Sequence, residues 1–434
     1  MHTPLAQVLE QMATTTPPGI HLGLERVEAL LQRLGNPHRQ LRFIHVAGTN
    51  GKGSTIAFLE AILLAQGIRV GTYTSPHLVR LNERIRIQGV ELDDATLATA
   101  FVKILEASEA IPTTWFEKIT VAALCLFAEH GLTITSDTPS LVLLETGLGG
   151  RLDATNVVVP EVALVTALGL DHQEFLGADI ETIAWEKAGI FKSSVPARTS
   201  CTPGPAQEVL IRHARRIGAP LQLLGHDFFS IVSEADRSWI YTDAQGRLEL
   251  PPPGLAGRHQ YENAALAVAA IRALHSTWNV TPEAIARGIT RVNWPGRLQR
   301  IATTTPPLLL DGAHNPLGIV TLARALAEDP CPPAQRTVIF SALKDKDSPA
   351  MIKILAPLVD KVVVVAVGGL RGCPVETLTQ QWQKVGKRVR VAPNLAAAWT
   401  RAQEITPETG QIIITGSLYL VGEACSLLNS PSLL

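Results

Sequence analysis

Residues 45–55, HVAGTNGKGST, decide the fold of the chain. The apolar run LRFIHVAG (41–48) ends inside this stretch, and polar residues between glycines follow it. Glycines after a buried strand let the backbone approach a phosphate, and the amide N–H groups of such a loop point toward it. The usual phosphate loop reads G-x-x-x-x-G-K-[ST], whereas here Gly53 stands between Lys52 and Ser54. The stretch therefore predicts a loop that binds a nucleoside triphosphate, with a sequence that differs from the usual motif.

Two side-chain types in this loop carry the expected chemistry. Lys52 supplies a point charge for the β- and γ-phosphates, and Ser54 or Thr55 offers a hydroxyl to Mg²⁺. An ordinary glycine-rich turn between a strand and a helix is the competing interpretation. The loop alone is compatible with a kinase, a GTPase or an ATP-driven ligase. The residues expected to bind ATP here are Thr49, Asn50, Gly51, Lys52, Gly53 and Ser54.

The segments around the loop alternate between apolar runs and helical patterns. The predicted helices are 54–67 and 117–131, and the predicted strands are 69–75, 140–147 and 161–169. Strands separated by helices indicate a mostly parallel sheet that is covered on both faces. Residues 195–255 carry Pro, Gly and short alternating runs, and we expect a small, partly antiparallel appendage there. Residues 257–275 return to a helical pattern.

A joint follows at VNWPGRLQR (292–300), where Pro295-Gly296 breaks any helix. After it the alternation restarts, with strands predicted at 307–314, 336–343, 361–367, 388–392 and 410–417 and helices between them. The fold class expected is therefore α/β, with a P-loop NTPase-like, mostly parallel sheet domain and a smaller Rossmann-like α/β domain. The expected boundaries are 1–293 for the ATP-binding domain, 294–299 for a linker and 300–434 for the C-terminal domain.

Composition excludes several classes of protein. The chain has 434 residues, 46% hydrophobic and 18% charged, which is ordinary for packed globular domains. With a net charge of −1, the protein as a whole is not attracted electrostatically to nucleic acid or to a membrane surface. The five cysteines show no metal-type spacing, which favours reduced thiols in the cytoplasm. We expect no signal peptide and no membrane helix.

A series of motifs resembles the Mur ligase superfamily, and within it the folate-adding ligases, the dihydrofolate synthases and folylpolyglutamate synthases. The spelling GTNGKGS is followed in family order by TSPHLVRLNERIRIQG, LLETGLGGRLDATN, LDHQEFLG, EKAGIFK, LAGRHQYENA, WPGRLQ, DGAHNP and TGSLYLVGE. One such motif is a weak signal, but all of them in order form a strong one. The resemblance runs through nearly the whole chain.

The resemblance implies an ATP-dependent ligase. ATP phosphorylates a substrate carboxylate, the amine of L-glutamate attacks the acyl phosphate, and phosphate leaves as an amide forms. The substrates implied are dihydropteroate, reduced folates, or both. Asp153 and the intact TSPHLVR and TWFE segments favour the bifunctional case. The two domains suit this chemistry, since the reactants would meet between them.

The implied cofactors are two Mg²⁺ ions with ATP as co-substrate. The resemblance implies that Ser75, Glu145 and His172 belong to the metal site and that Lys187 is carbamylated to an anion that helps hold the second ion. A carboxylate at a strand end suits a hard cation, whereas a lone His is more often structural. For Lys187, a solvated helix lysine is the alternative.

The remaining site residues are also implied by resemblance. Asn263 is expected at the adenine, Arg297 at the transferring phosphate, and Asp311 at the ribose or nucleotide. His314 and Ser417 are expected to meet the incoming glutamate, with His314 serving as base, donor or phosphate contact. Lys187, His314 and Arg297 form the expected catalytic set. The expected folate-side residues are Phe116, Glu117, Leu152, Asp153 and Ala154. The competing interpretations are a core-packing Phe116, a helix-capping Asp153 and a solvated Arg297.

A cell-wall Mur ligase that joins an amino acid to a UDP-sugar peptide is the alternative function. Such enzymes usually carry an extra N-terminal domain, and the phosphate loop at residue 48 leaves no room for one. A plain P-loop switch or kinase has no use for the second domain. We expect only small-molecule partners, no nucleic acid, no membrane, a monomeric state and a cytoplasmic location.

Overall fold

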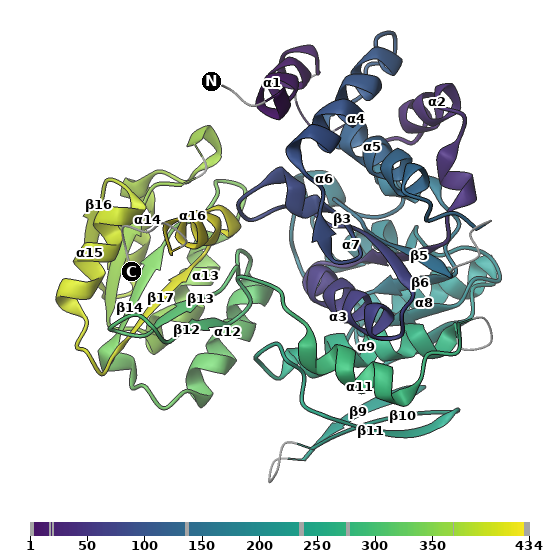
Figure 1. The fold of residues 1–434 in the computed structure, drawn as a ribbon. Helices are drawn as coiled ribbons and strands as arrows, with labels where there is room; N and C mark the ends of the chain where they lie inside the picture. Colours follow the sequence, from purple (N-terminus) through teal and green to yellow (C-terminus); the bar gives the residue numbers. More distant parts are fainter. Residues whose placement is uncertain are drawn as a thin grey trace. The chain divides into compact units, whose positions relative to one another are not determined.

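The computed structural model describes residues 4–16, 19, 21–134, 139–233, 238–274, 278–367 and 369–428. The chain divides into two compact units. The first unit comprises 1–168, 173–254 and 260–293, and the second comprises 169–172, 255–259 and 294–434. Figure 1 draws both units. No helix among the described residues is both long and apolar enough to cross a bilayer.

In its described residues, the first unit holds an eight-stranded sheet that carries the phosphate loop. Its strands, in spatial order, are β4 (Val90–Glu91), β3 (Ile85–Ile87), β2 (Arg69–Tyr73), β5 (Ser140–Glu145), β1 (Phe43–Ala47), β6 (Val162–Val165), β7 (Ala197–Thr199) and β8 (Leu221–Leu223). The strands from β2 to β8 are parallel, and β3 and β4 add an antiparallel edge. Strand β1 is central and wholly buried, which explains its continuous apolar run.

The helices of the first unit pack on this sheet, and their apolar side chains form its hydrophobic cores. They are α1 (Pro4–Thr15), α2 (Glu25–Arg33), α3 (Lys52–Ala65), α4 (Asp94–Ala107), α5 (Trp115–Glu129), α6 (Gln173–Leu176), α7 (Ile180–Ala188), α8 (Pro205–Ile217), α9 (His259–Ala273) and α11 (Pro282–Arg291). One core joins α2, α4 and α5 to the sheet, and another joins α7 and α8 to β6 and β7. Helices α3 and α9 are apolar nearly all round, which suits their burial.

The appendage predicted at 195–255 is smaller than expected. A three-stranded antiparallel sheet is present, formed by β9 (Phe228–Val232), β10 (Trp239–Asp243) and β11 (Gly246–Leu250). The first part of that segment instead forms β7, α8 and β8, which extend the main sheet. Strands of only three residues and the Pro and Gly around them concealed this parallel unit from pattern reading.

In its described residues, the second unit has a six-stranded sheet. Its strands, in spatial order, are β12 (Gln299–Ile301), β13 (Leu308–Leu310), β17 (Gln411–Thr415), β14 (Arg336–Phe340), β15 (Lys361–Val365) and β16 (Arg388–Ala392). Its helices are α12 (Pro316–Glu328), α13 (Ser348–Leu355), α14 (Val375–Lys384), α15 (Leu395–Ile405) and α16 (Leu418–Leu428). All neighbouring strands are parallel except β12, which runs antiparallel to β13. The predicted α/β fold class is thus confirmed.

Candidate active site

The phosphate loop lies between β1 and α3 and is fixed to the end of β6. The backbone N–H groups of Thr49 and Asn50 donate to the Ala167 carbonyl at 3.0 and 3.2 Å. The Thr166 hydroxyl donates to the Asn50 carbonyl at 2.7 Å. Gly48 has φ 151°, and a Cβ there would lie 1.8 Å from Thr166 Oγ1. The close approach of β6 therefore requires glycine at position 48.

Gly51 and Asn263 bring α9 to the same loop. Gly51 has φ 92°, and a Cβ on it would lie 2.5 Å from Oδ1 of Asn263. Asn263 is buried, and its Nδ2 donates to Gln260 at 3.0 Å. Asn263 was expected beside the nucleotide, and the structure places it against the phosphate loop. The unusual Gly53 lies in the first turn of α3.

Lys52, Glu145 and Ser75 come together beside the loop. Lys52 Nζ lies 3.8 Å from Glu145 Oε1 and donates to the Gly48 carbonyl at 3.2 Å. Glu145, the last residue of β5, is 4% exposed, and its Oε2 accepts from the Ser75 N–H at 3.1 Å. Since β1 and β5 are parallel neighbours, their carboxyl ends place lysine and carboxylate at one sheet edge.

The two candidate hydroxyls differ in their surroundings. Ser54 Oγ accepts from Gln260 Nε2 at 3.4 Å. Thr55 Oγ1 is buried without a hydrogen-bond partner among the described residues. A buried orphan hydroxyl is unusual, and a cation bound with the triphosphate would satisfy it. The described residues hold no group of three His, Cys, Asp or Glu side chains arranged for a metal.

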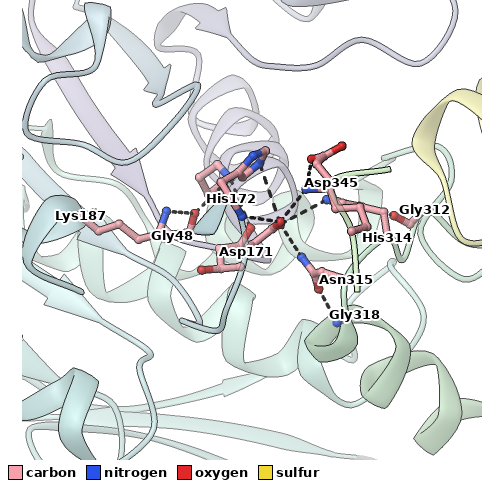
Figure 2. Close-up of polar contacts among 12 residues, drawn as sticks. Gly48, Asp171, His172, Lys187, Gly312, His314, Asn315, Gly318 and Asp345 are labelled. Carbon is pink, nitrogen blue, oxygen red and sulfur yellow. Dashed lines mark hydrogen bonds and ion pairs between the residues drawn. The ribbon is translucent and has the colours of Figure 1, made fainter. Parts of the chain in front are cut away.

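Lys187, near the end of α7, also reaches the phosphate loop. Its side chain is 5% exposed, and Nζ donates to the Gly48 carbonyl at 2.9 Å (Figure 2). The helix is capped at its start by Asp179, whose carboxylate accepts from the Thr182 N–H, and it ends at Ala188 with Gly189 as its C-cap. Lys187 is therefore not the solvated helix lysine of the alternative interpretation.

Asp153 is buried at the start of a short 3-10 helix, η3 (Ala154–Val157). Its Oδ1 accepts from the N–H and hydroxyl of Thr155, and its Oδ2 accepts from the Leu148 N–H at 2.8 Å. Burial raises the pKa of this carboxyl, while these hydrogen bonds oppose the rise. The capping role weighed as an alternative is thus present, and the same carboxylate shapes the glycine-rich loop before it. Its neighbours Leu152 and Ala154 lie half-buried and buried.

Phe116 and Glu117 begin α5. A Cβ on Gly147 would lie 2.3 Å from the Phe116 ring, so this ring covers the glycine-rich loop. Glu117 is buried and accepts from the Thr114 N–H at 2.6 Å, which completes a capping box. Its Oε1 also lies 2.8 Å from Arg26 Nη2. Sequence reasoning did not identify Arg26 as the partner of Glu117.

In the second unit, Asp311 and Arg297 lie at the end of β13. Asp311 is buried and accepts from the N–H groups of Leu298 and Ala313 at 2.9 and 3.0 Å. Burial raises the pKa of this carboxyl, and these N–H groups with the Arg297 guanidinium oppose the rise. A Cβ on Gly312 would lie 2.3 Å from Arg297 Nη1. Arg297 and Asp311, which were expected independently from the sequence, therefore lie next to each other at the end of β13.

A polar cluster surrounds Asp171 in the second unit (Figure 2). The carboxylate pairs with Lys346 Nζ at 2.5 Å and accepts from Asn315 Nδ2 at 2.8 Å. His314 Nε2 and His172 Nε2 lie 3.8 and 4.0 Å from Asp171 Oδ2. Burial would raise the pKa of Asp171, but the Lys346 ammonium and both imidazoles hold it well below its usual range.

Sequence reasoning named the two histidines of this cluster and missed the other members. Asp171 directly precedes His172, and Asn315 directly follows His314, so both lay within quoted motifs. Lys346 lay in no motif. His314 donates or accepts through Nδ1 at the Gly312 carbonyl, 2.8 Å away. Burial lowers the pKa of His314 to about 4, so the imidazole is neutral at pH 7.

Ser417 follows β17 and precedes α16. Its side chain is buried, and Oγ accepts from the Tyr419 N–H at 3.2 Å. Gly416 before it has φ 97°, and a Cβ there would lie 2.2 Å from the Ser341 carbonyl. The sharp turn therefore holds the Ser417 hydroxyl at the start of a helix.

Comparison with known proteins gives consistent matches along the chain. Residues 46–271 match the Mur ligase middle domain, and residues 296–418 match the Mur ligase glutamate ligase domain. The dihydrofolate synthase/folylpolyglutamate synthase of Bacillus subtilis is 35% identical over 417 residues, covering 93% of this chain and 94% of the relative.

Two solved structures are similar over nearly their whole length. Escherichia coli FolC in complex with DHPP and ADP has a TM-score of 0.90 and 36% identity, with 98% of each chain covered. The bifunctional folylpolyglutamate synthase/dihydrofolate synthase of Yersinia pestis, complexed with AMPPNP and a Mn ion, has a TM-score of 0.87 and 34% identity. That match covers 99% of this chain and 98% of the other.

Proposed function

The chain belongs to the dihydrofolate synthase/folylpolyglutamate synthase family of Mur ligases, and from this we propose how its residues act. It is an ATP-dependent ligase that adds L-glutamate to dihydropteroate, to reduced folates, or to both. The observation that carries the proposal is the phosphate loop with Glu145 Oε1 3.8 Å from Lys52 Nζ. This arrangement suits a metal-bound triphosphate, and the glutamate ligase domain that follows it suits amide formation.

The reaction proceeds in two balanced steps. A carboxylate oxygen of the folate substrate attacks the γ-phosphorus of ATP, which gives an acyl phosphate and ADP. The amine of L-glutamate then attacks the acyl carbon, inorganic phosphate leaves with the original carboxylate oxygen, and the amine loses a proton. We propose that Lys52 and the amides of residues 48–52 hold the phosphates and that Arg297 balances charge on the transferred group.

The residues at the loop suit Mg²⁺. Glu145 offers a buried carboxylate and Thr55 a buried hydroxyl without a partner among the described residues. When bound, the ion would neutralise charge on the phosphate oxygens. We propose Ser75 and His172 as further members of the site, two Mg²⁺ ions in all, and a carbamate on Lys187. The Mn ion in the Yersinia pestis relative supports a divalent cation in that enzyme.

We propose that His314 accepts the proton of the attacking amine. Its pKa of about 4 keeps the imidazole neutral. If Nδ1–H donates to the Gly312 carbonyl at 2.8 Å, Nε2 carries the lone pair. Ser417 and His314 are proposed to contact glutamate, and the Asp171–Lys346 pair holds the cluster around His314 in place.

We propose further residues for the nucleotide and for the folate substrate. Asn263 and Asp311 contact the nucleotide, in addition to the phosphate loop. Residues 152–154 with Phe116 and Glu117 form the folate side, and Asp153 contacts the pterin. The assigned roles are ATP and folate binding for 1–293, a linker at 294–299, and glutamate ligation for 300–434. We also propose that the enzyme is a monomer and that it is cytoplasmic; only the second point is supported by the five free cysteines, which suit a reducing compartment.

A phosphate-release assay tests this function. The purified protein should release phosphate from ATP only when L-glutamate is present together with dihydropteroate or tetrahydrofolate. Omission of either organic substrate serves as the control. Phosphate release driven instead by a UDP-sugar peptide and an amino acid would overturn the proposal in favour of a cell-wall ligase.

A further inference from the structure

We propose that His45 is a positioning residue for the folate side of the site: through the Thr155 hydroxyl, it fixes the carboxylate of Asp153. The inference rests on the proposed contact of Asp153 with the pterin. His45 lies three residues before Gly48 in β1, and it is the polar side chain of this otherwise apolar, wholly buried strand. No role in the proposed mechanism uses it.

Three side chains form a continuous hydrogen-bonded chain inside the first unit. His45 Nε2 lies 2.8 Å from Thr155 Oγ1, although 110 positions separate the two residues in sequence. Thr155 Oγ1 donates to Asp153 Oδ1. All three residues are buried, with His45 and Thr155 fully so. This series of hydrogen bonds therefore links the strand before the phosphate loop to the segment expected to bind folate.

The direction of these hydrogen bonds follows from the number of available protons. The single hydroxyl proton of Thr155 is committed to the Asp153 carboxylate, so Oγ1 accepts from His45 and Nε2 must carry the proton. Nδ1 of His45 then carries the lone pair, and it is the ring nitrogen that has no partner among the described residues. The ring is neutral because burial, with Lys192 nearby, lowers the pKa of His45 to about 3.

These hydrogen bonds determine the orientation of the Asp153 carboxylate. Oδ2 is held by the Leu148 N–H, and Oδ1 is held by the N–H and hydroxyl of Thr155. His45 fixes the rotamer of that hydroxyl, so its loss leaves Oδ1 with a less directed donor. A neutral donor in the sheet achieves this without a charge that would pair with Asp153 directly. The expected effect falls on the folate substrate and not on ATP.

The test compares His45→Leu with His45→Gln, which keeps an N–H donor at a similar reach. His45→Leu should raise KM for dihydropteroate roughly 3- to 10-fold, the effect expected for one neutral hydrogen bond. His45→Gln should recover most of this loss, and KM for ATP should stay unchanged in both variants. If His45→Leu does not fold, Thr155→Val takes its place and should raise KM for dihydropteroate in the same way. Thr155→Ser, which keeps the hydroxyl, is its control and should recover most of the loss.

A double-mutant cycle with Asp153→Ala separates this inference from the function on which it rests. Asp153→Ala should raise KM for dihydropteroate more than KM for tetrahydrofolate, and adding His45→Leu should bring no further rise. If Asp153→Ala leaves both values unchanged, the proposed pterin contact fails. If it raises KM but His45→Leu alone has no effect, or adds its full effect on top, the positioning role is refuted. An equal rise in KM for ATP would also refute it.

Discussion

Lys187 is the residue whose proposed chemistry departs most from its ordinary state. Its side chain is 5% exposed, and Nζ donates to the Gly48 carbonyl of the phosphate loop. An ammonium in this place would repel a divalent cation near the triphosphate. A carbamate, formed from the amine and CO₂, inverts the charge and offers two oxygen ligands. The burial of Lys187 against the loop supports this modification.

Replacement of Lys187 should therefore abolish turnover in a way that an added carboxylate repairs. Lys187→Ala is expected to lower kcat at least about 100-fold, the lower end for removal of a preorganised charged group. Acetate or formate should restore part of the activity, because it occupies the space of the carbamate. Lys187→Arg is the matched control, which should stay inactive with either salt. Full activity of untreated Lys187→Ala would remove this residue from the mechanism.

Residues within sequence motifs were predicted better than their partners. Lys52, Glu145 and Asn263 were named from the sequence, and each lies at the phosphate loop. Lys346 could not be predicted, because its contact with Asp171 joins segments 175 positions apart. Such pairs leave no periodic pattern and no local spacing. The proposed roles of all these residues remain predictions for the assays above.

At the level of secondary structure, helix α3 and strand β6 explain the unusual sequence of the phosphate loop. Gly53 falls inside the first turn of α3, so the extra glycine extends the helix start and not the loop. The loop itself depends on Gly48, which approaches Thr166 of the β6 end too closely for a side chain. Strand β1, the loop and helix α3 are therefore continuous, and residues of the β6 end and of α9 contact the loop and hold it in place.

Gly48→Ala should consequently impair ATP use without unfolding the protein. A Cβ would lie 1.8 Å from Thr166 Oγ1 and 3.1 Å from the Thr166 backbone nitrogen, so the loop must shift. We expect kcat/KM for ATP to fall about 100-fold, as a displacement of about 1 Å in a catalytic loop can cause. Steady-state kinetics, with circular dichroism to check the fold, measure this effect.

Gly67→Ala is the matched control for Gly48→Ala. Gly67 also has a left-handed backbone, with φ 81°, but no atom lies within 4 Å of its Cβ position. Both substitutions strain the backbone by roughly 1–2 kcal/mol, so both should lower stability. Only Gly48→Ala should affect ATP. Equal kinetic losses in the two variants would refute the steric account of the loop.

Long apolar runs predicted their strands well, whereas several three-residue strands were not predicted. The runs at β1, β5, β14, β15 and β17 were each predicted as strands, because buried parallel strands read as continuous apolar sequence. Strands β7, β8 and β12 have three residues each and give too short a pattern. Strand order and register depend on long-range pairing, which no local pattern contains.

At the scale of the whole molecule, the chain divides its chemistry between two units. The first unit holds the phosphate loop, Glu145, Lys187 and the segment with Asp153 that we propose to bind folate. The second holds Asp311, His314 and Ser417. The last part of the second unit begins at Trp294, next to the Pro295-Gly296 joint noted in the sequence, whereas nothing in the sequence indicated that residues 169–172 and 255–259 belong to the same unit. A chain that leaves and re-enters a unit gives no compositional signal at the crossing points.

In the proposed reaction, the folate carboxylate takes the γ-phosphoryl group of ATP and becomes an acyl phosphate before glutamate attacks. Dihydropteroate labelled with ¹⁸O in both carboxylate oxygens tests this directly, with ATP and L-glutamate as the other substrates. The first step moves one labelled oxygen into the acyl phosphate, and the second releases it with inorganic phosphate. Mass spectrometry should therefore find dihydrofolate formed together with phosphate that carries one ¹⁸O atom. Unlabelled phosphate accompanying dihydrofolate formation would contradict the account.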